Sequence, residues 1–232
     1  MKLNRVRRVN DAVSVRRALI SVADKTGLDD FIRRVWEIIP DLNVYSTGGT
    51  YAAIAAVAEA IGLSDRVVPI SDYTGQPEMQ GGLVKTLDYR IYAGLLSETF
   101  NPAHERDIAR VEAVPFDVTI CNFYPFERTA AEKETTAEDL RTHIDIGGPT
   151  MLRASAKNFL RVAALCDPAD YASFLEEIDT HNGATTLAWR ADYALRAFRY
   201  TARYESAIAR ALADRIARAE WESLYEYEER TP

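Results

Sequence analysis

Short apolar segments alternate with helical patterns over the first three quarters of the chain. The apolar segments are residues 18–22, 43–46, 66–70, 91–96, 116–123 and 161–166. Strands that are apolar throughout and separated by helices are typical of a parallel sheet covered on both faces. Helices are predicted over residues 28–39 and 50–61, the second ending at Gly62, which suits a helix C-terminus. The pattern predicts an α/β fold with a mostly parallel sheet over about residues 17–166.

The pattern changes to helix alone after about residue 167. Asp167 and Pro168 form a helix start, with an acidic cap followed by proline at the first helical position. A long charged and aromatic stretch with helical spacing follows. We interpret residues 167–228 as a helical portion, either a layer packed on the sheet or an arm of a dimer. Because no repeat or flexible linker interrupts the chain, residues 1–232 are predicted to form a single unit.

Composition narrows the classes of function. Hydrophobic residues make up 47% of the chain, charged residues 27%, and the net charge is −7. A nucleic-acid surface needs a basic stripe, which this sequence lacks. The basic N-terminus is short and lacks the apolar core of a signal peptide. We therefore expect a cytoplasmic protein that binds neither nucleic acid nor membrane.

The cysteines and histidines are too few and too scattered for a structural metal site. Cys121 and Cys166 lie in apolar, strand-like segments and are expected to be buried free thiols. A zinc site needs more ligands at closer spacing than two isolated cysteines and three histidines can give. No metal is predicted.

Two loops that follow the first two predicted strands carry the features of an anion site. The first loop has Ser21, Asp24 and Lys25, and the second has Thr47, Gly48, Gly49 and Thr50. Each places hydroxyl groups and free backbone N–H groups at the start of a helix, where the helix dipole favours an anion. Either loop alone is as well explained by helix capping. Together, at one edge of a sheet, they predict a phosphate site.

Lys85 has apolar neighbours in the sequence, namely Leu83, Val84 and Leu87. If these residues removed the amine from water, its pKa would fall and the group could transfer protons near neutral pH. The alternative is a lysine whose stem packs while its amine reaches solvent.

Tyr124 follows the predicted strand 116–123 and precedes Pro125, so it lies at the carboxyl end of that strand. Parallel sheets bind their ligands at this edge. The residue is either a catalytic group on the rim or a third member of an aromatic cluster with Phe123 and Phe126.

The segment 143–159 raises the question of whether Asp145 and Lys157 belong to one site. Asp145 precedes Gly147 and Gly148 at a predicted helix start, where an acid is favoured by the helix dipole. A continuous helix between Asp145 and Lys157 would hold them roughly 18 Å apart. A shared site therefore requires the chain to bend between them.

Taken together, the motifs resemble a known family. The segments SVADKTG, STGGT, DYTGQPEM, VKTL, CNFYPFE, IDIGGPTMLRASAKN and DPADY resemble, in order and spacing, the inosine monophosphate (IMP) cyclohydrolase domain of the bifunctional purine-biosynthesis protein. The resemblance covers about residues 17–210. It implies a methylglyoxal-synthase-like three-layer sandwich that closes 5-formamidoimidazole-4-carboxamide ribonucleotide to IMP with loss of water, the last step of de novo purine biosynthesis.

The resemblance also implies a site and partners. The catalytic positions correspond to Lys85, Tyr124, Asp145 and Lys157. The substrate-binding positions correspond to Ser21, Asp24, Lys25, Thr47, Gly48, Gly49, Thr50, Thr86, Cys121, Asn122, Ile146 and Gly147. The two lysines would move protons and stabilise the oxyanion, Tyr124 would bind the formyl group, and Asp145 would orient the carboxamide. The resemblance further implies no cofactor, a homodimer, and a separate transformylase that supplies the substrate.

The chain departs from the family pattern at several positions. Leu83 replaces a family arginine, Asp88 and Tyr89 replace His-Pro, and Tyr92 and Phe159 each replace a histidine. If the lost arginine held substrate charge, either the affinity for the substrate is lower in this chain or Arg90 substitutes for the arginine. These departures keep two alternatives open: a related cyclase acting on a modified carboxamide nucleotide, and a nucleotide-sensing module without catalysis.

Overall fold

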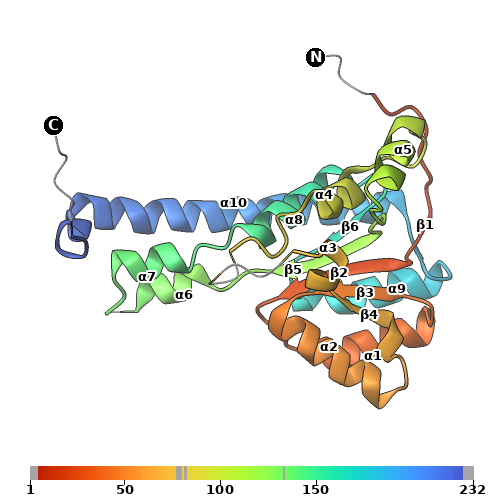
Figure 1. Cartoon of the computed structure of the whole chain (residues 1–232), viewed down its shortest axis with the longest axis horizontal. Coiled ribbons are helices and arrows are strands. Elements are labelled where there is room, and N and C mark those ends of the chain that lie inside the picture. Colours follow the sequence, from red (N-terminus) through yellow and green to blue (C-terminus); the bar gives the residue numbers. More distant parts are fainter. Residues whose placement is uncertain (1–4, 77–79, 81–82, 133, 227–232) are drawn as a thin grey trace.

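The computed structural model describes residues 5–76, 80, 83–132 and 134–226, and it is built around a five-stranded sheet (Figure 1). The strands are β2 (Arg17–Val22), β3 (Asn43–Ser46), β4 (Val67–Pro69), β5 (Val118–Asn122) and β6 (Ala163–Leu165). Their order is β4-β3-β2-β5-β6, and every neighbouring pair is parallel. Five of the six predicted strands are therefore confirmed, together with the parallel arrangement.

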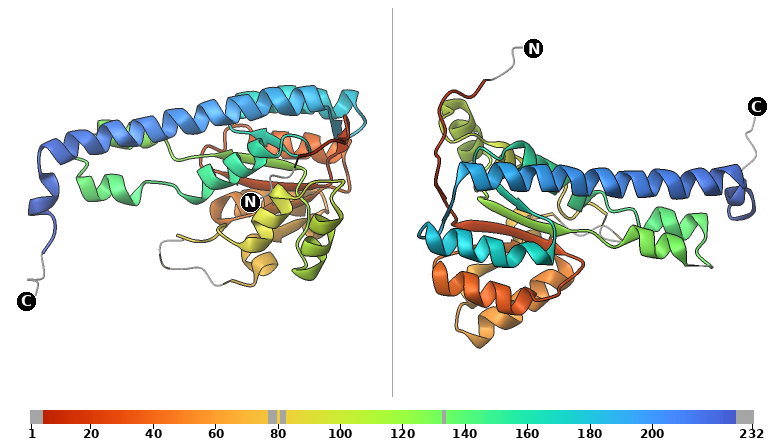
Figure 2. Two further views of the ribbon diagram at one scale, coloured as in Figure 1. Left: turned by 90° about the horizontal axis from the view of Figure 1, so that it is seen from above. Right: turned by 180° about the vertical axis from the view of Figure 1, so that it is seen from behind.

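Helices cover both faces of the sheet and make a three-layer sandwich (Figures 1 and 2). One face carries α1 (Leu28–Ile38), α2 (Gly48–Ala60) and α9 (Tyr171–Thr180), and the other carries α4 (Tyr89–Leu96), α8 (Gly147–Lys157) and α10 (Leu187–Ala217). Each face has its own buried apolar cluster: Phe31 and Ile54 belong to the first, and Ile91 and Met151 to the second. All five positions of β5 are buried, as expected for a strand covered on both sides.

Local sequence signals set several helix ends. Gly62 follows α2 with a φ of 76°, and the N–H of Leu63 donates to the carbonyl of Ala58 at 2.8 Å, which confirms the predicted C-terminal turn. Asp167 accepts from the N–H of Ala169 at 2.9 Å, so it acts as the predicted cap. A single 3₁₀ turn, Pro168–Asp170, then leads into α9.

The prediction of a strand over residues 91–96 is wrong, because this segment lies in α4. Asp88 caps the helix by accepting from the N–H of Arg90 at 2.7 Å. Ile91 and Leu95 are fully buried while Leu96 is 38% exposed, so burial follows the helical spacing of four residues. A six-residue apolar run does not distinguish a buried strand from a buried helix. The two-stranded antiparallel sheet of β1 (Val13–Ser14) and β7 (Ala184–Thr185) was not predicted.

The predicted C-terminal helical portion is dominated by α10. Its first half packs on the sheet, and its second half extends beyond the sheet beside α6 (Phe126–Ala131) and α7 (Ala137–Thr142) (Figures 1 and 2). Glu220 fastens this extension by accepting from the N–H of Ala137 at 2.9 Å and pairing with Arg215 at 2.8 Å. Residues 227 and 228, within the predicted helical portion, lie outside the described residues.

The smaller elements are α3 (Ile70–Thr74), α5 (Pro102–Arg110) and two 3₁₀ turns, Ser64–Arg66 and Glu220–Ser223. Among the helices of the described ranges, none combines the length and apolar character needed to span a membrane.

Candidate active site

A cavity of about 600 Å³ lies at the carboxyl ends of β2, β3 and β5, closed by the segment that leads into α8. It brings together most of the predicted site residues: Ser21, Lys25, Thr47, Gly48, Gly49, Thr50, Lys85, Thr86, Asn122, Tyr124, Asp145, Ile146 and Gly147. Asp24, Cys121 and Lys157 do not line it.

At one end of the cavity, two lysine amines lie beside the N-terminus of a helix. A methyl group added at Gly48 would lie 3.6 Å from Nζ of Lys85, and one added at Gly49 would lie 3.9 Å from Nζ of Lys25. Both amines therefore lie over the first turn of α2. The hydroxyls of Ser21 and Thr47 are 3.2 Å apart beside them. Free N–H groups, hydroxyls and two cations make this end suitable for a phosphate.

Thr50 supports this end from behind. Its buried hydroxyl donates to the carbonyl of Val22 at 2.9 Å and accepts from the N–H of the same residue at 3.1 Å. The side chain thus ties α2 to β2 and keeps the two loops in register.

The apolar surroundings expected for Lys85 do not form. Leu83, Val84 and Leu87 are themselves 64%, 45% and 39% exposed, because this turn lies on the surface with its apolar side chains outward. Thr86, in contrast, is buried, and a methyl group at Gly147 would meet its hydroxyl at 2.5 Å. Glycine at position 147 therefore lets the Lys85 turn pack against the start of α8.

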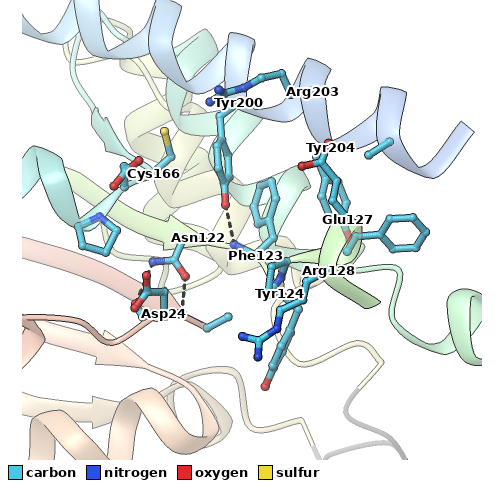
Figure 3. Close-up of a pocket in the computed structure, with 16 residues that line it drawn as sticks. Asp24, Asn122, Phe123, Tyr124, Glu127, Arg128, Cys166, Tyr200, Arg203 and Tyr204 are labelled. Atoms are coloured by element: carbon cyan, nitrogen blue, oxygen red, sulfur yellow. Dashed lines mark hydrogen bonds between the residues drawn. The ribbon is translucent and has the colours of Figure 1, made fainter. Parts of the chain in front are cut away.

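Asn122 and Tyr124 form one wall. The Asn122 amide accepts from the N–H of Asp24 at 2.8 Å and donates to its carbonyl at 3.0 Å, which clamps β5 to the loop after β2 (Figure 3). Phe123 and Phe126 are buried, but Tyr124 is 64% exposed. Tyr124 therefore does not join the aromatic cluster, and its ring projects from the wall.

Asp145 is held at the mouth of α8 by backbone contacts. Its carboxylate accepts from the N–H of Gly148 at 3.0 Å, and its own N–H donates to the hydroxyl of Tyr204 at 2.7 Å. Burial raises the pKa of this carboxyl above its usual value, although the N–H groups of Gly148 and Gly147 oppose the shift. A carboxylate with a raised pKa is a stronger base.

Lys157 lies away from this cavity. Helix α8 runs without a break from Gly147 to Lys157, so the bend that a shared site would require is absent. At 1.5 Å per residue, the backbones of Asp145 and Lys157 are separated by roughly 18 Å. Lys157 is exposed at the far end of the helix, and within one chain the two residues do not form one site.

Cys121 and Asp24 also differ from their predicted places. Cys121 is a buried free thiol, as expected, and its Sγ lies 3.6 Å from the carbonyl of Gly148 behind the cavity wall. Burial raises its pKa well above the usual range. The Asp24 carboxylate turns away and accepts from the hydroxyl of Thr26 at 2.6 Å.

Arg90 does not replace the cation lost at position 83. Its guanidinium donates to the carbonyl of Tyr73 at 2.8 Å and pairs with Glu112 at 3.8 Å. It does not line the cavity, so the proposed substitution is wrong. Pro77, Glu78 and Met79 of the DYTGQPEM motif lie outside the described residues.

Residues 142–144 also line the cavity, although they are not among the predicted site residues. His143 has its Nδ1 2.7 Å from the carbonyl of Asp139. Because a carbonyl only accepts, this nitrogen carries the proton. The sequence could have pointed to His143, because it lies two positions before Asp145. No signal pointed to Tyr204, which is 59 residues away from Asp145 in the sequence.

The described ranges hold no group of three or more histidine, cysteine, aspartate or glutamate side chains arranged to bind a metal ion.

Comparisons with known proteins find families, curated relatives and a solved structure that the chain resembles. The sequence model of the MGS-like domain family matches residues 27–150, which is more than half of the chain, and that of the AICARFT/IMPCHase bienzyme matches residues 155–231. The chain is 44% identical over 202 residues to the bifunctional purine biosynthesis protein PurH of Nostoc punctiforme, covering 87% of this chain and 38% of that protein. It is 43% identical over 208 residues to PurH of Chlorobium chlorochromatii, covering 89% and 38%.

The chain thus spans little more than a third of the length of these curated relatives. Among solved structures, the crystal structure of ForH superposes with a TM-score of 0.68 at 28% identity, covering 86% of this chain and all of that one.

Proposed function

Because this chain belongs to the MGS-like domain family and is a PurH-like cyclohydrolase domain, we propose that it closes 5-formamidoimidazole-4-carboxamide ribonucleotide to IMP. One observation carries the proposal. A partly buried, basic carboxylate (Asp145) and an exposed phenol (Tyr124) line the same cavity as a phosphate-sized cluster of N–H groups and cations that includes the amines of Lys25 and Lys85. A nucleotide fits this arrangement, because its phosphate can lie at the cationic end of the cavity and its reacting base beside Asp145 and Tyr124.

The phosphate end orients the substrate. In our proposal Lys25, Ser21 and the first turn of α2 hold the 5′-phosphate, and Asn122 and Thr86 face the ring. Holding the carboxamide and the formamide of one molecule coplanar and in contact removes much of the entropic barrier to ring closure.

Proton transfer completes the reaction. The carboxamide nitrogen attacks the formyl carbon and loses one proton to Asp145, while the formyl oxygen gains a proton. The resulting hydroxyl then leaves as water with the proton of the former formamide nitrogen. Tyr124 donates to the formyl oxygen as it gains charge. The amine of Lys85, which lies over the first turn of α2, must turn away from the phosphate end to act as the second donor. General acid–base help of this kind typically contributes about 10²–10⁴-fold.

The single-chain mechanism does not use Lys157, because its amine does not line the cavity. A catalytic role for it requires a second copy of the chain to bring that amine to the site. The formyl group of the substrate must come from a separate formyl-transferring reaction.

A second candidate is a cyclase for a modified carboxamide nucleotide. The observation that favours it is the exposed Leu83 in place of a cation, with Arg90 engaged elsewhere. The structural similarity to ForH extends over 86% of this chain and all of that one, so ForH is the solved structure with which to compare position 83.

The test is direct. Purified protein given the formamido ribonucleotide should generate the ultraviolet absorbance of IMP. Absence of product at high enzyme concentration, with intact IMP binding, would exclude this substrate and favour the modified nucleotide. If the protein neither forms IMP nor binds it, this cavity is not a nucleotide site and the proposed function is wrong.

A further inference from the structure

A second cavity lies at the same edge of the sheet, on the side that faces α10 (Figure 3). Its volume is about 670 Å³, within the range of pockets that hold small organic ligands. It is bounded by the residues that follow β2, β5 and β6 and by the middle of α10. Asn122 and Tyr124 line both cavities, so a single wall separates them.

The carboxylates of this second cavity already have partners. Asp24 accepts from the hydroxyl of Thr26 at 2.6 Å, Asp167 accepts from the N–H of Ala169 at 2.9 Å, and Glu127 pairs with Arg210 at 3.6 Å. Burial, with Asp170 and Asp167 nearby, raises the pKa of Cys166 to about 12, so its thiol is neutral. Hydrogen bonds from a hydroxyl and an N–H hold the side chains of Asp24 and Asp167 in place but leave them charged, so a bound anion would lie at the guanidiniums and not at these carboxylates.

The two guanidiniums of the cavity, in contrast, are available. Arg128 and Arg203 are exposed, and among the described residues neither guanidinium donates a hydrogen bond or joins an ion pair. They lie at opposite ends of the cavity (Figure 3). A free guanidinium presents a planar fork of donors that matches a phosphate.

The wall between the two arginines is aromatic. Phe123, Tyr124, Tyr200 and Tyr204 line it. The hydroxyl of Tyr200 accepts from the N–H of Phe123 at 3.2 Å, so this ring is fixed in place (Figure 3). Tyr124 is largely exposed and offers an open face. Flat aromatic ligands stack on such rings.

We propose that this cavity binds a nucleoside monophosphate other than the substrate. Its base would lie on the aromatic wall, and its phosphate would be held by Arg203. Arg128 at the opposite end faces the sugar and base. The proposal goes beyond the cyclisation reaction and does not depend on it, because Arg128 and Arg203 do not line the candidate active site.

Calorimetric titration with adenosine 5′-monophosphate tests the proposal. The wild-type protein should bind it, and Arg203→Gln should weaken binding by about tenfold, as expected for the loss of one charge-assisted hydrogen bond. Arg199→Gln is the matched control, because Arg199 is an exposed arginine on the same helix that lines neither cavity. It should bind as the wild type does. Far-ultraviolet circular dichroism checks that both variants are folded.

A third variant separates the two cavities. Lys25→Gln changes the phosphate end of the candidate active site only, so it should keep its affinity for adenosine 5′-monophosphate. Loss of binding in Lys25→Gln but not in Arg203→Gln would overturn the proposal, as would the absence of binding to wild type at millimolar ligand. Because no turnover is measured, a failure here is independent of whether the protein cyclises the formamido ribonucleotide.

Discussion

At the scale of single residues, Asp145 shows how one side chain combines a structural and a chemical task. Its carboxylate accepts from the N–H of Gly148 and thereby caps the start of α8. Glycine is needed at position 148, because a methyl group there would lie 2.5 Å from Oδ2 of Asp145. The same burial that this packing imposes raises the pKa of the carboxyl and strengthens it as a base.

The Asp145→Asn variant should separate the two tasks. The amide oxygen can still accept from Gly148, so the cap survives, but the base is lost. We expect cyclisation to fall at least about 100-fold, the low end of general base catalysis. Initial rates from the ultraviolet assay measure this, and IMP titration provides the control because binding should persist. A variant with wild-type turnover would show that Asp145 is not the base.

The raised pKa of Asp145 also predicts how stability depends on pH. A carboxyl whose pKa is higher in the folded state than in the unfolded state binds more protons when folded, so its ionisation opposes folding. This contribution favours the fold at acid pH and is lost as the pH rises through the folded-state pKa. Asp145→Asn should therefore be at least as stable as wild type at pH 7 and lose that advantage near pH 3. Urea unfolding at both pH values measures the difference, and greater stability of wild type at pH 7 would contradict it.

At the scale of elements, α10 does more than cover the sheet. Its Tyr200 accepts from the N–H of Phe123, which follows β5, and its Tyr204 accepts from the N–H of Asp145, which precedes α8. Two neighbouring turns of one helix thus hold the backbones of the two segments that carry Tyr124 and Asp145. The helix sets the spacing of these groups although it contributes none of the lining of the candidate active site.

Tyr204→Phe should weaken this link. The change leaves a half-buried N–H without its acceptor, and we expect a loss of about 1–2 kcal/mol in the free energy of unfolding together with a lower kcat. Tyr193→Phe is the matched control on the same helix. Tyr193 lines neither cavity and stacks on Trp189 with ring centroids 3.7 Å apart, and phenylalanine keeps this stack. If the two variants lose the same fraction of kcat, Tyr204 has no positioning role.

The elements also show what sequence could and could not predict. The strands in 43–46 and 116–123 were found because short, largely apolar segments that alternate with helices are typical of a parallel sheet. The segment 91–96 has the same apolar character but lies in a helix, because an apolar run alone does not distinguish a buried strand from a buried helix. The loops that carry Lys25 and Gly48 were found because hydroxyls and glycines at helix starts have a physical signature. The misplacement of Arg90 and the contact of Tyr204 with Asp145 concern distances across the fold, which local patterns do not encode. The assignment of Lys157 to the site stays a prediction, because a second copy of the chain would have to supply its amine.

At the scale of the whole molecule, Arg190 joins segments from both ends of the chain. Its side chain is fully buried on α10 and donates to the carbonyls of Phe159 at 2.9 Å, Leu160 at 3.2 Å and Asn10 at 3.1 Å, and also to that of Thr185. These carbonyls belong to the N-terminal segment, the turn between α8 and β6, and β7. Burial lowers the pKa of the guanidinium to about 10, so it is still charged at neutral pH.

Arg190→Met should therefore destabilise the molecule strongly. Methionine fills much of the volume but removes the donor to four carbonyls, one of them in a buried contact and three in partly buried ones. We expect a loss of about 3–5 kcal/mol in the free energy of unfolding, because each acceptor left unsatisfied costs about 1–3 kcal/mol. Arg199→Met makes the same change at an exposed position of the same helix and should cost less than about 1 kcal/mol. Urea unfolding of both variants at pH 7 gives the comparison. Equal midpoints would mean that the N-terminal segment and β7 are held without Arg190.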